Sequence, residues 1–190
     1  MAPAPHQELL ERAIATDGAA YRALLAGDGP RARALLAEAA GLYRRSWELA
    51  PPRSFGRLVA MEKSALLAGD PSAADYVRDR IEGAGDSPTS CYAVAVAALA
   101  RGEDELAARA TAGMRGAGEA FDRAAEALER ILAGDAEGCR AAVAAIVADF
   151  ATREAHLTGV PIADTALLME ELAGRRGLVA RPASEAAPPA

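Results

Sequence analysis

Several residue types are scarce in the 190-residue sequence. It has no Asn, one Gln and one Lys, and aromatic residues make up only 4% of it. β-Sandwiches and barrels use many aromatic and β-branched residues, so this shortage excludes an all-β fold. Ala accounts for 51 residues, and Ala is the best helix former. The composition therefore predicts an all-α protein.

Clustered positive charge is also missing. The chain has 21 Lys and Arg against 27 Asp and Glu, a net charge of −6, and its Arg residues are scattered. Nucleic-acid-binding proteins present a basic patch or stripe, so we expect no nucleic-acid partner. No run approaches 18 apolar residues, and the first residues, Met-Ala-Pro-Ala-Pro-His, lack the features of a signal peptide. We therefore expect no membrane association and a cytoplasmic location.

Cysteines and catalytic motifs are few or absent. Cys91 and Cys139 lie 48 residues apart, without a CxxC motif or a neighbouring His, which excludes a local zinc motif and predicts buried, reduced thiols. The sequence has no P-loop and no GxGxxG, GxSxG or HExxH motif. We therefore predict no cofactor, no metal and no catalytic residue.

The most informative feature that is present is a repeated corner. Leu-Ala-Gly-Asp occurs at residues 25–28, 67–70 and 132–135, and Leu-Ala-Arg-Gly-Glu occurs at 99–103. Gly suits the left-handed position that ends a helix, and the acidic residue suits the N-cap of the next helix. The glycines are 42, 33 and 32 residues apart, and the last two intervals match the period of helical-hairpin repeats.

These corners and the Gly- and Pro-containing separators between them divide the chain into nine predicted helices. We expect them at residues 6–26, 30–50, 54–68, 71–83, 88–101, 103–114, 118–133, 136–157 and 161–174. Gly18 is expected to weaken the first helix and could split it in two. The predicted architecture is a right-handed array of four hairpins and a closing helix, forming one domain over residues 1–180. Residues 181–190, rich in Pro and Ala, are expected to form an extended tail.

Helical periodicity predicts which faces are buried. In the third helix Phe55, Leu58 and Leu66 share one stripe, and the stripe of the eighth helix runs from Cys139 to Leu157. Residues 91–99 are apolar on every side. We therefore expect the fifth helix to be central, with neighbours all around it.

Glu62 is the main anomaly, because it projects from the apolar stripe of the third helix. A buried carboxylate needs a compensating partner. Arg44 or Arg45 could supply this partner. We favour Arg80, which lies beside Tyr76 in the fourth predicted helix, at a position equivalent to that of Glu62 in the third. The alternative is that Glu62, Tyr76, Arg80 and Tyr92 line an inter-helix pocket of a small-molecule binder or enzyme.

Trp47, the only tryptophan, lies at the edge of the stripe of the second helix, beside Tyr43 and Arg44. Trp, Tyr and Arg dominate interface energetics, so these three residues are candidate contacts for a partner protein. The alternative is that Trp47 packs against the next helix near Pro51 and Pro52.

The corners resemble those of tetratricopeptide-type repeats over residues 22–157. The family's Trp, Gly-Tyr and Pro pattern is not in register here, so its peptide-binding residues are not transferred. The C-terminal third, with Ala133-Gly134-Asp135, Phe150 and residues 172–178, resembles all-helical immunity proteins encoded beside bacterial polymorphic toxins. That resemblance implies a protein that binds and blocks one toxin.

The leading prediction is a non-enzymatic helical-repeat protein that binds another polypeptide. The alternatives are an immunity or inhibitor protein, and a small-molecule binder or enzyme with an inter-helix polar pocket. A protein is the expected partner, and self-association is left open.

Overall fold

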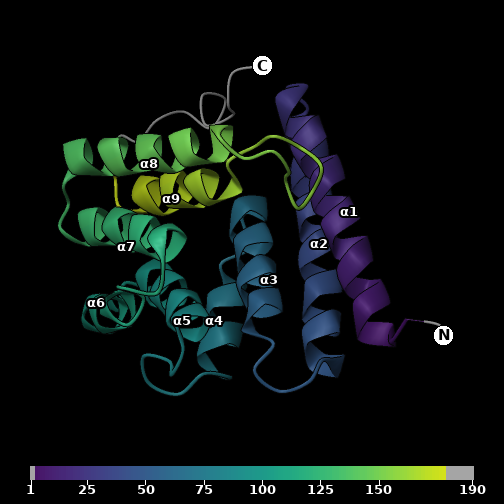
Figure 1. Cartoon of the computed structure of the whole chain (residues 1–190), viewed down its shortest axis with the longest axis horizontal. Coiled ribbons are helices and arrows are strands. Elements are labelled where there is room, and N and C mark those ends of the chain that lie inside the picture. Colours follow the sequence, from purple (N-terminus) through teal and green to yellow (C-terminus); the bar gives the residue numbers. More distant parts are fainter. Residues whose placement is uncertain (1–2, 179–190) are drawn as a thin grey trace. The chain divides into compact units, whose positions relative to one another are not determined.

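In the computed structural model, which describes residues 3–178, the secondary structure is entirely helical (Figure 1). The nine helices of this part of the chain are α1 (Pro5–Leu25), α2 (Gly29–Leu49), α3 (Phe55–Ala68), α4 (Ser72–Arg78), α5 (Pro88–Arg101), α6 (Asp104–Ala112), α7 (Glu119–Leu132), α8 (Ala136–Ala151) and α9 (Asp164–Arg175). The all-α prediction is confirmed. The tail predicted at residues 181–190 lies outside the described residues.

The four predicted corners adopt one backbone geometry. Gly27, Gly69, Gly102 and Gly134 have φ angles of 77°, 92°, 78° and 68°. At each corner the Gly N–H donates to the carbonyl three residues earlier, and the next N–H donates to the carbonyl five residues earlier, as from Asp28 to Ala23 at 2.9 Å. This is the Schellman motif. The predicted left-handed Gly corner is confirmed at all four positions.

The acidic residues that follow these glycines do not all act as caps. The carboxylate of Asp28 accepts from the N–H of Arg31 at 3.1 Å, and that of Asp135 accepts from Gly138 at 2.8 Å. Glu103 instead accepts from Nε of Arg101 at 2.6 Å and does not cap α6. Glu103 occupies the predicted N-cap position of α6, but the predicted cap by its side chain is wrong, because its carboxylate is engaged by the side chain of Arg101.

The chain divides into two compact units. Among the described residues, the first unit holds 3–73 and 156–160, and the second holds 74–155 and 161–178. The single domain over residues 1–180 stays a prediction. None of the helices within residues 3–178 is both long and apolar enough to cross a membrane.

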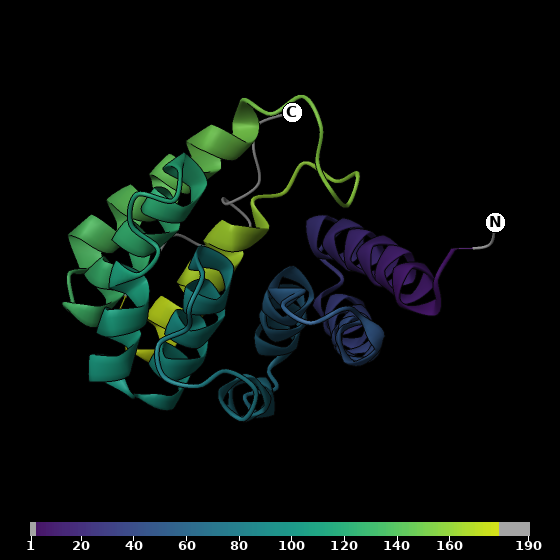
Figure 2. The ribbon, with the colours of Figure 1, turned by 60° about the horizontal axis from the view of Figure 1, so that its bottom comes forward.

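The first unit is built on α1, α2 and α3, with α2 packed against both of the others (Figure 2). Residues 156–160 complete it, and the carbonyl oxygen of Thr158 lies 2.6 Å from where a Cβ on Gly18 would be. Helix α1 is continuous through Gly18, so the single predicted helix is confirmed and the alternative of two short helices is wrong. Gly18 allows this loop to approach the helix closely.

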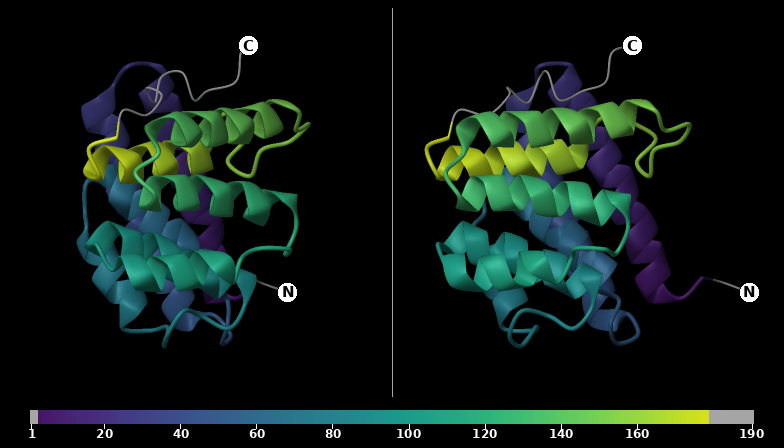
Figure 3. Two further views of the ribbon diagram at one scale, coloured as in Figure 1. Left: turned by 90° about the vertical axis from the view of Figure 1, so that its left-hand side faces the viewer. Right: turned by 60° about the vertical axis from the view of Figure 1, so that its left-hand side comes forward.

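The second unit has α5 in its core. Residues 93–99 of α5 are almost completely buried, and α5 packs against α6, α7 and α9, as predicted for a central helix. Helices α7, α8 and α9 lie side by side (Figure 3). Cys91 and Cys139 are buried free thiols, as predicted.

Two helices, α4 and α8, end at least five residues earlier than predicted. Helix α4 stops at Arg78, whose guanidinium donates to the carbonyls of Ile81 and Gly83 beyond the helix. Helix α8 stops at Ala151, and residues 156–160 belong to the first unit. Leu157, predicted to face inward from this helix, is 80% exposed.

Candidate functional site

Tyr43 is not at the surface. Its side chain is 2% exposed, and its hydroxyl donates to Oδ2 of Asp17 at 2.9 Å. The prediction that Tyr43 contacts a partner is therefore wrong. Buried hydroxyls need hydrogen-bond partners, and the carboxylate of Asp17 supplies one here.

Asp17 joins three helices of the first unit. While Tyr43 of α2 donates to Oδ2, Ser64 of α3 donates to Oδ1 at 2.9 Å, and Asp17 itself belongs to α1. All three side chains are buried. Asp17 is not among the predicted site residues, although its spacing from Ala13 and Ala20 places it on the inner face of α1. The test of periodicity applied to Glu62 would have identified it.

Trp47 and Arg44 remain accessible. Trp47 is half-buried and stacks on Phe55 of α3, with ring centroids 5.5 Å apart. The predicted packing of Trp47 on the next helix is confirmed. Arg44 lies on the exposed face of α2 and pairs with Glu48 at 3.0 Å. Arg44 and Trp47 are three residues apart and share one side of the helix.

A second group of side chains lies on another side of α2. Arg45 and Leu49 are four residues apart on the same face; both are exposed, Leu49 by 59%. Next to them, Ser46 accepts from Nε of Arg57 at 2.9 Å and donates to the carbonyl of His6 at 2.6 Å. These contacts hold the N-terminal ends of α1 and α3 against the C-terminal end of α2.

Glu62 is buried, as predicted, with an exposed fraction of 1%. Its Oε1 has no hydrogen-bond partner among the described residues, and burial alone raises the pKa of its carboxyl well above the usual 4.5. The predicted pairing with an Arg, including Arg80, is therefore wrong. Glu62 lies almost opposite Ser64 on α3, so it does not point toward the Asp17 carboxylate.

Replacing Glu62 with Gln should stabilise the protein at neutral pH. A raised folded-state pKa means that the folded state binds more protons than the unfolded state, so stability is full below about pH 4.5 and falls as the pH rises. Gln keeps the shape and does not ionise. The gain in unfolding free energy should therefore be largest at pH 7 and shrink toward pH 4.5, as measured by urea denaturation. A pH-independent difference would contradict this assignment.

The other predicted pocket residues, Tyr76, Arg80 and Tyr92, belong to the second unit, whereas Glu62 belongs to the first. Arg80, in the second unit, stacks its guanidinium 3.5 Å from the ring centroid of Tyr76 and donates to the Tyr76 carbonyl. Tyr92 packs edge-on against Phe121 of α7, with centroids 6.4 Å apart. Each side chain is thus engaged by a near neighbour in its own unit.

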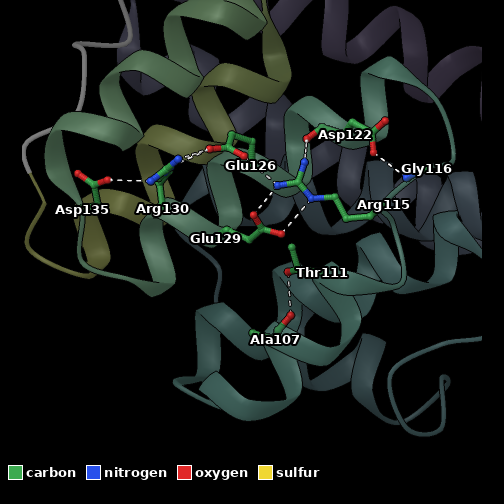
Figure 4. A network of polar contacts seen from close by, with 9 residues as sticks. All are labelled: Ala107, Thr111, Arg115, Gly116, Asp122, Glu126, Glu129, Arg130 and Asp135. Carbon is green, nitrogen blue, oxygen red and sulfur yellow. Dashed lines mark hydrogen bonds and ion pairs between the residues drawn. The ribbon is translucent and has the colours of Figure 1, made fainter.

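An exposed ion-pair network connects α7 with the segments on either side of it (Figure 4). Arg115, after α6, donates to Glu126 and Glu129, and Arg130 donates to Glu126 and to Asp135, the α8 N-cap. These contacts raise the pKa of Arg115 and lower that of the Glu126 carboxyl. The charges of both arginines are neutralised within the second unit, so we assign this network a structural role.

Neither metal clusters nor known relatives identify the function. No group of three or more His, Cys, Asp or Glu within residues 3–178 is arranged to hold a metal ion. Comparison with protein-family models, with curated proteins and with solved structures finds no match.

Proposed function

We propose that the chain is a non-enzymatic, cytoplasmic helical-repeat protein that binds another polypeptide. The repeat assignment is supported by the Schellman geometry shared at Gly27, Gly69, Gly102 and Gly134. Stacked helical hairpins provide extended binding surfaces. The proposed architecture is a right-handed, tetratricopeptide-like array.

The observation that carries the binding proposal is the stacked Trp47–Phe55 pair, which joins the C-terminal end of α2 to the N-terminal end of α3. Trp47 is half-buried, so its ring is fixed by packing while part of it remains accessible. The exposed Arg44–Glu48 pair lies on the same side of α2. A rigid aromatic side chain with charged neighbours is typical of interface hot spots.

Affinity capture from the source cell with the wild-type chain and a Trp47→Ala variant tests the proposal. A specific protein should be recovered by the wild type, and its affinity for Trp47→Ala should be about 30-fold weaker, a loss of about 2 kcal/mol typical of hot spots. Isothermal titration calorimetry with the purified partner measures this loss.

Leu25→Ala is the matched control, because Leu25 is an exposed apolar residue of the first unit that lies away from the Trp47–Phe55 pair, at the end of α1. It should leave the affinity unchanged. An equal loss of affinity for both variants, or an affinity that Trp47→Ala does not change, would place the binding surface elsewhere. Recovery of a small metabolite and no protein would contradict the proposed function.

A further inference from the structure

Helix α3 connects the interior of the first unit to the Trp47–Phe55 pair. Its Ser64 donates to the buried carboxylate of Asp17 on α1 at 2.9 Å. Its first residue, Phe55, stacks on Trp47 of α2, with ring centroids 5.5 Å apart. A displacement of α3 would therefore change the stacking of the aromatic pair.

Glu62 is buried on α3 without compensation. It follows Phe55 by seven residues, so the two side chains lie two turns apart on the same face of the helix. Its exposed fraction is 1%, and its Oε1 has no hydrogen-bond partner in the described part of the chain. A buried carboxyl in such surroundings is stable only in its protonated, neutral form. The packing of α3 therefore depends on a proton at Glu62.

The ionisable side chains that face α3 within the first unit do not stabilise a charged Glu62. Asp17 and Tyr21 face inward from α1, and Tyr43 of α2 donates to Asp17. The charged side chains of α2 are all exposed, and Arg57 and Lys63 of α3 are partly exposed. Burial is the only cause of the raised pKa of the Glu62 carboxyl, so none of these groups offsets it.

The N-terminal end of α3 is the end most easily displaced. Residues 55–57 are exposed or half-buried, and the side chain of Ser54, the N-cap, makes no capping hydrogen bond. This end is held to α2 by the bond from Arg57 to Ser46 and by the stacking of Phe55. Uncapped helix ends with few buried contacts open more easily than the core. A shift of α3 should therefore affect Phe55 before it affects Ser64.

We propose that Glu62 is a proton switch that controls the Trp47–Phe55 pair. With the proton bound, α3 stays packed and the two rings stay stacked. When the proton is released to solvent, the carboxylate must reach water, α3 shifts, and Phe55 leaves Trp47. The carboxyl ionises more readily in water than in the interior, so a rise in pH favours the open form. This inference rests on the proposed function and adds its regulation: the partner binds at low pH and dissociates as the pH rises.

The fluorescence of Trp47 tests the switch without a partner, because Trp47 is the only tryptophan. In a titration from about pH 4 to pH 9, the emission of the wild type should move to longer wavelength along a one-proton curve. Glu62→Gln keeps the shape and does not ionise, so its emission should stay at the short wavelength throughout. Glu62→Leu, a second neutral variant, should also show no pH dependence.

His6→Gln and Glu48→Gln are the matched controls, because each removes another ionisable group near Trp47. Glu48 is exposed beside Trp47, and the backbone carbonyl of His6 accepts from Ser46. Both variants should keep the wild-type transition. Three results would overturn the inference: no transition in the wild type, a transition that persists in Glu62→Gln, or a parallel loss of helical circular dichroism, which would indicate global unfolding.

Calorimetry with the purified partner separates this inference from the proposed function. The affinity of the wild type should be about tenfold weaker at the high-pH end of the titration, whereas that of Glu62→Gln should not change. If a partner depends on Trp47 but the emission does not depend on Glu62, the inference is wrong and the proposed function stands. If the emission depends on Glu62 but no polypeptide partner is recovered, the proposed function fails and the switch stands.

Discussion

Asp17→Ala should lower the free energy of unfolding by about 3 kcal/mol. The substitution leaves the buried hydroxyls of Tyr43 and Ser64 without the carboxylate to which both donate. It also removes the hydrogen-bonded contact among α1, α2 and α3. Urea denaturation followed by circular dichroism measures the loss.

Asp17→Asn is the matched control, because it keeps the volume and one carbonyl acceptor. It should lower the free energy of unfolding clearly less than Asp17→Ala does. Tyr43→Phe should lower it by about 1–2 kcal/mol. In a double-mutant cycle, the effects of Asp17→Ala and Tyr43→Phe on the free energy of unfolding should be strongly non-additive. If Asp17→Ala and Tyr43→Phe are additive, the hydrogen bond between them does not stabilise the first unit.

Gly18→Ala should destabilise the protein by about 2 kcal/mol, although Ala normally favours helices. The new Cβ would lie 2.6 Å from the carbonyl oxygen of Thr158, a backbone atom that cannot rotate away. We expect residues 156–160 to lose contact with α1. Hydrogen exchange in this segment should therefore speed up, and thermal denaturation should report the lower stability.

Gly41→Ala provides the control for helix propensity. Gly41 lies inside α2, and a Cβ there would meet no atom within 4 Å. This variant should be more stable than the wild type by about 0.5–1 kcal/mol, with unchanged exchange at residues 156–160. If Gly18→Ala behaves like Gly41→Ala, the close approach of Thr158 to α1 is not part of the stable fold.

Local features of the chain could be predicted from sequence, because their causes are local. A Gly in the left-handed conformation defines each corner through its own backbone, and all four Gly turns form as expected. The end of α8 could not be predicted in this way. Its sequence continues without a strong helix breaker as far as Gly159, yet the helix stops at Ala151, five residues before the segment 156–160 that belongs to the first unit. The membership of that segment in the first unit depends on contacts between distant parts of the chain, which local helix propensity does not report.

The candidate site was only partly predictable, because adjacent residues on a helix point in different directions. Tyr43, Arg44 and Trp47 look like one cluster in sequence, yet Tyr43 points inward to Asp17, 26 residues away. Burial of Glu62 followed from periodicity, whereas its lack of a hydrogen-bond partner depends on the neighbouring helices. Side-chain pairing between distant segments is not encoded in local spacing.

The first unit is discontinuous, and this affects its folding during synthesis. Helices α1 to α3 leave the ribosome first, but the segment His156–Val160 that completes the unit is made much later. At translation rates of about 5–20 residues per second, the delay is roughly 4 to 17 s. During that interval the α1 surface around Gly18 stays uncovered in the nascent chain. The first unit therefore becomes complete only after the helices up to α8 have been synthesised.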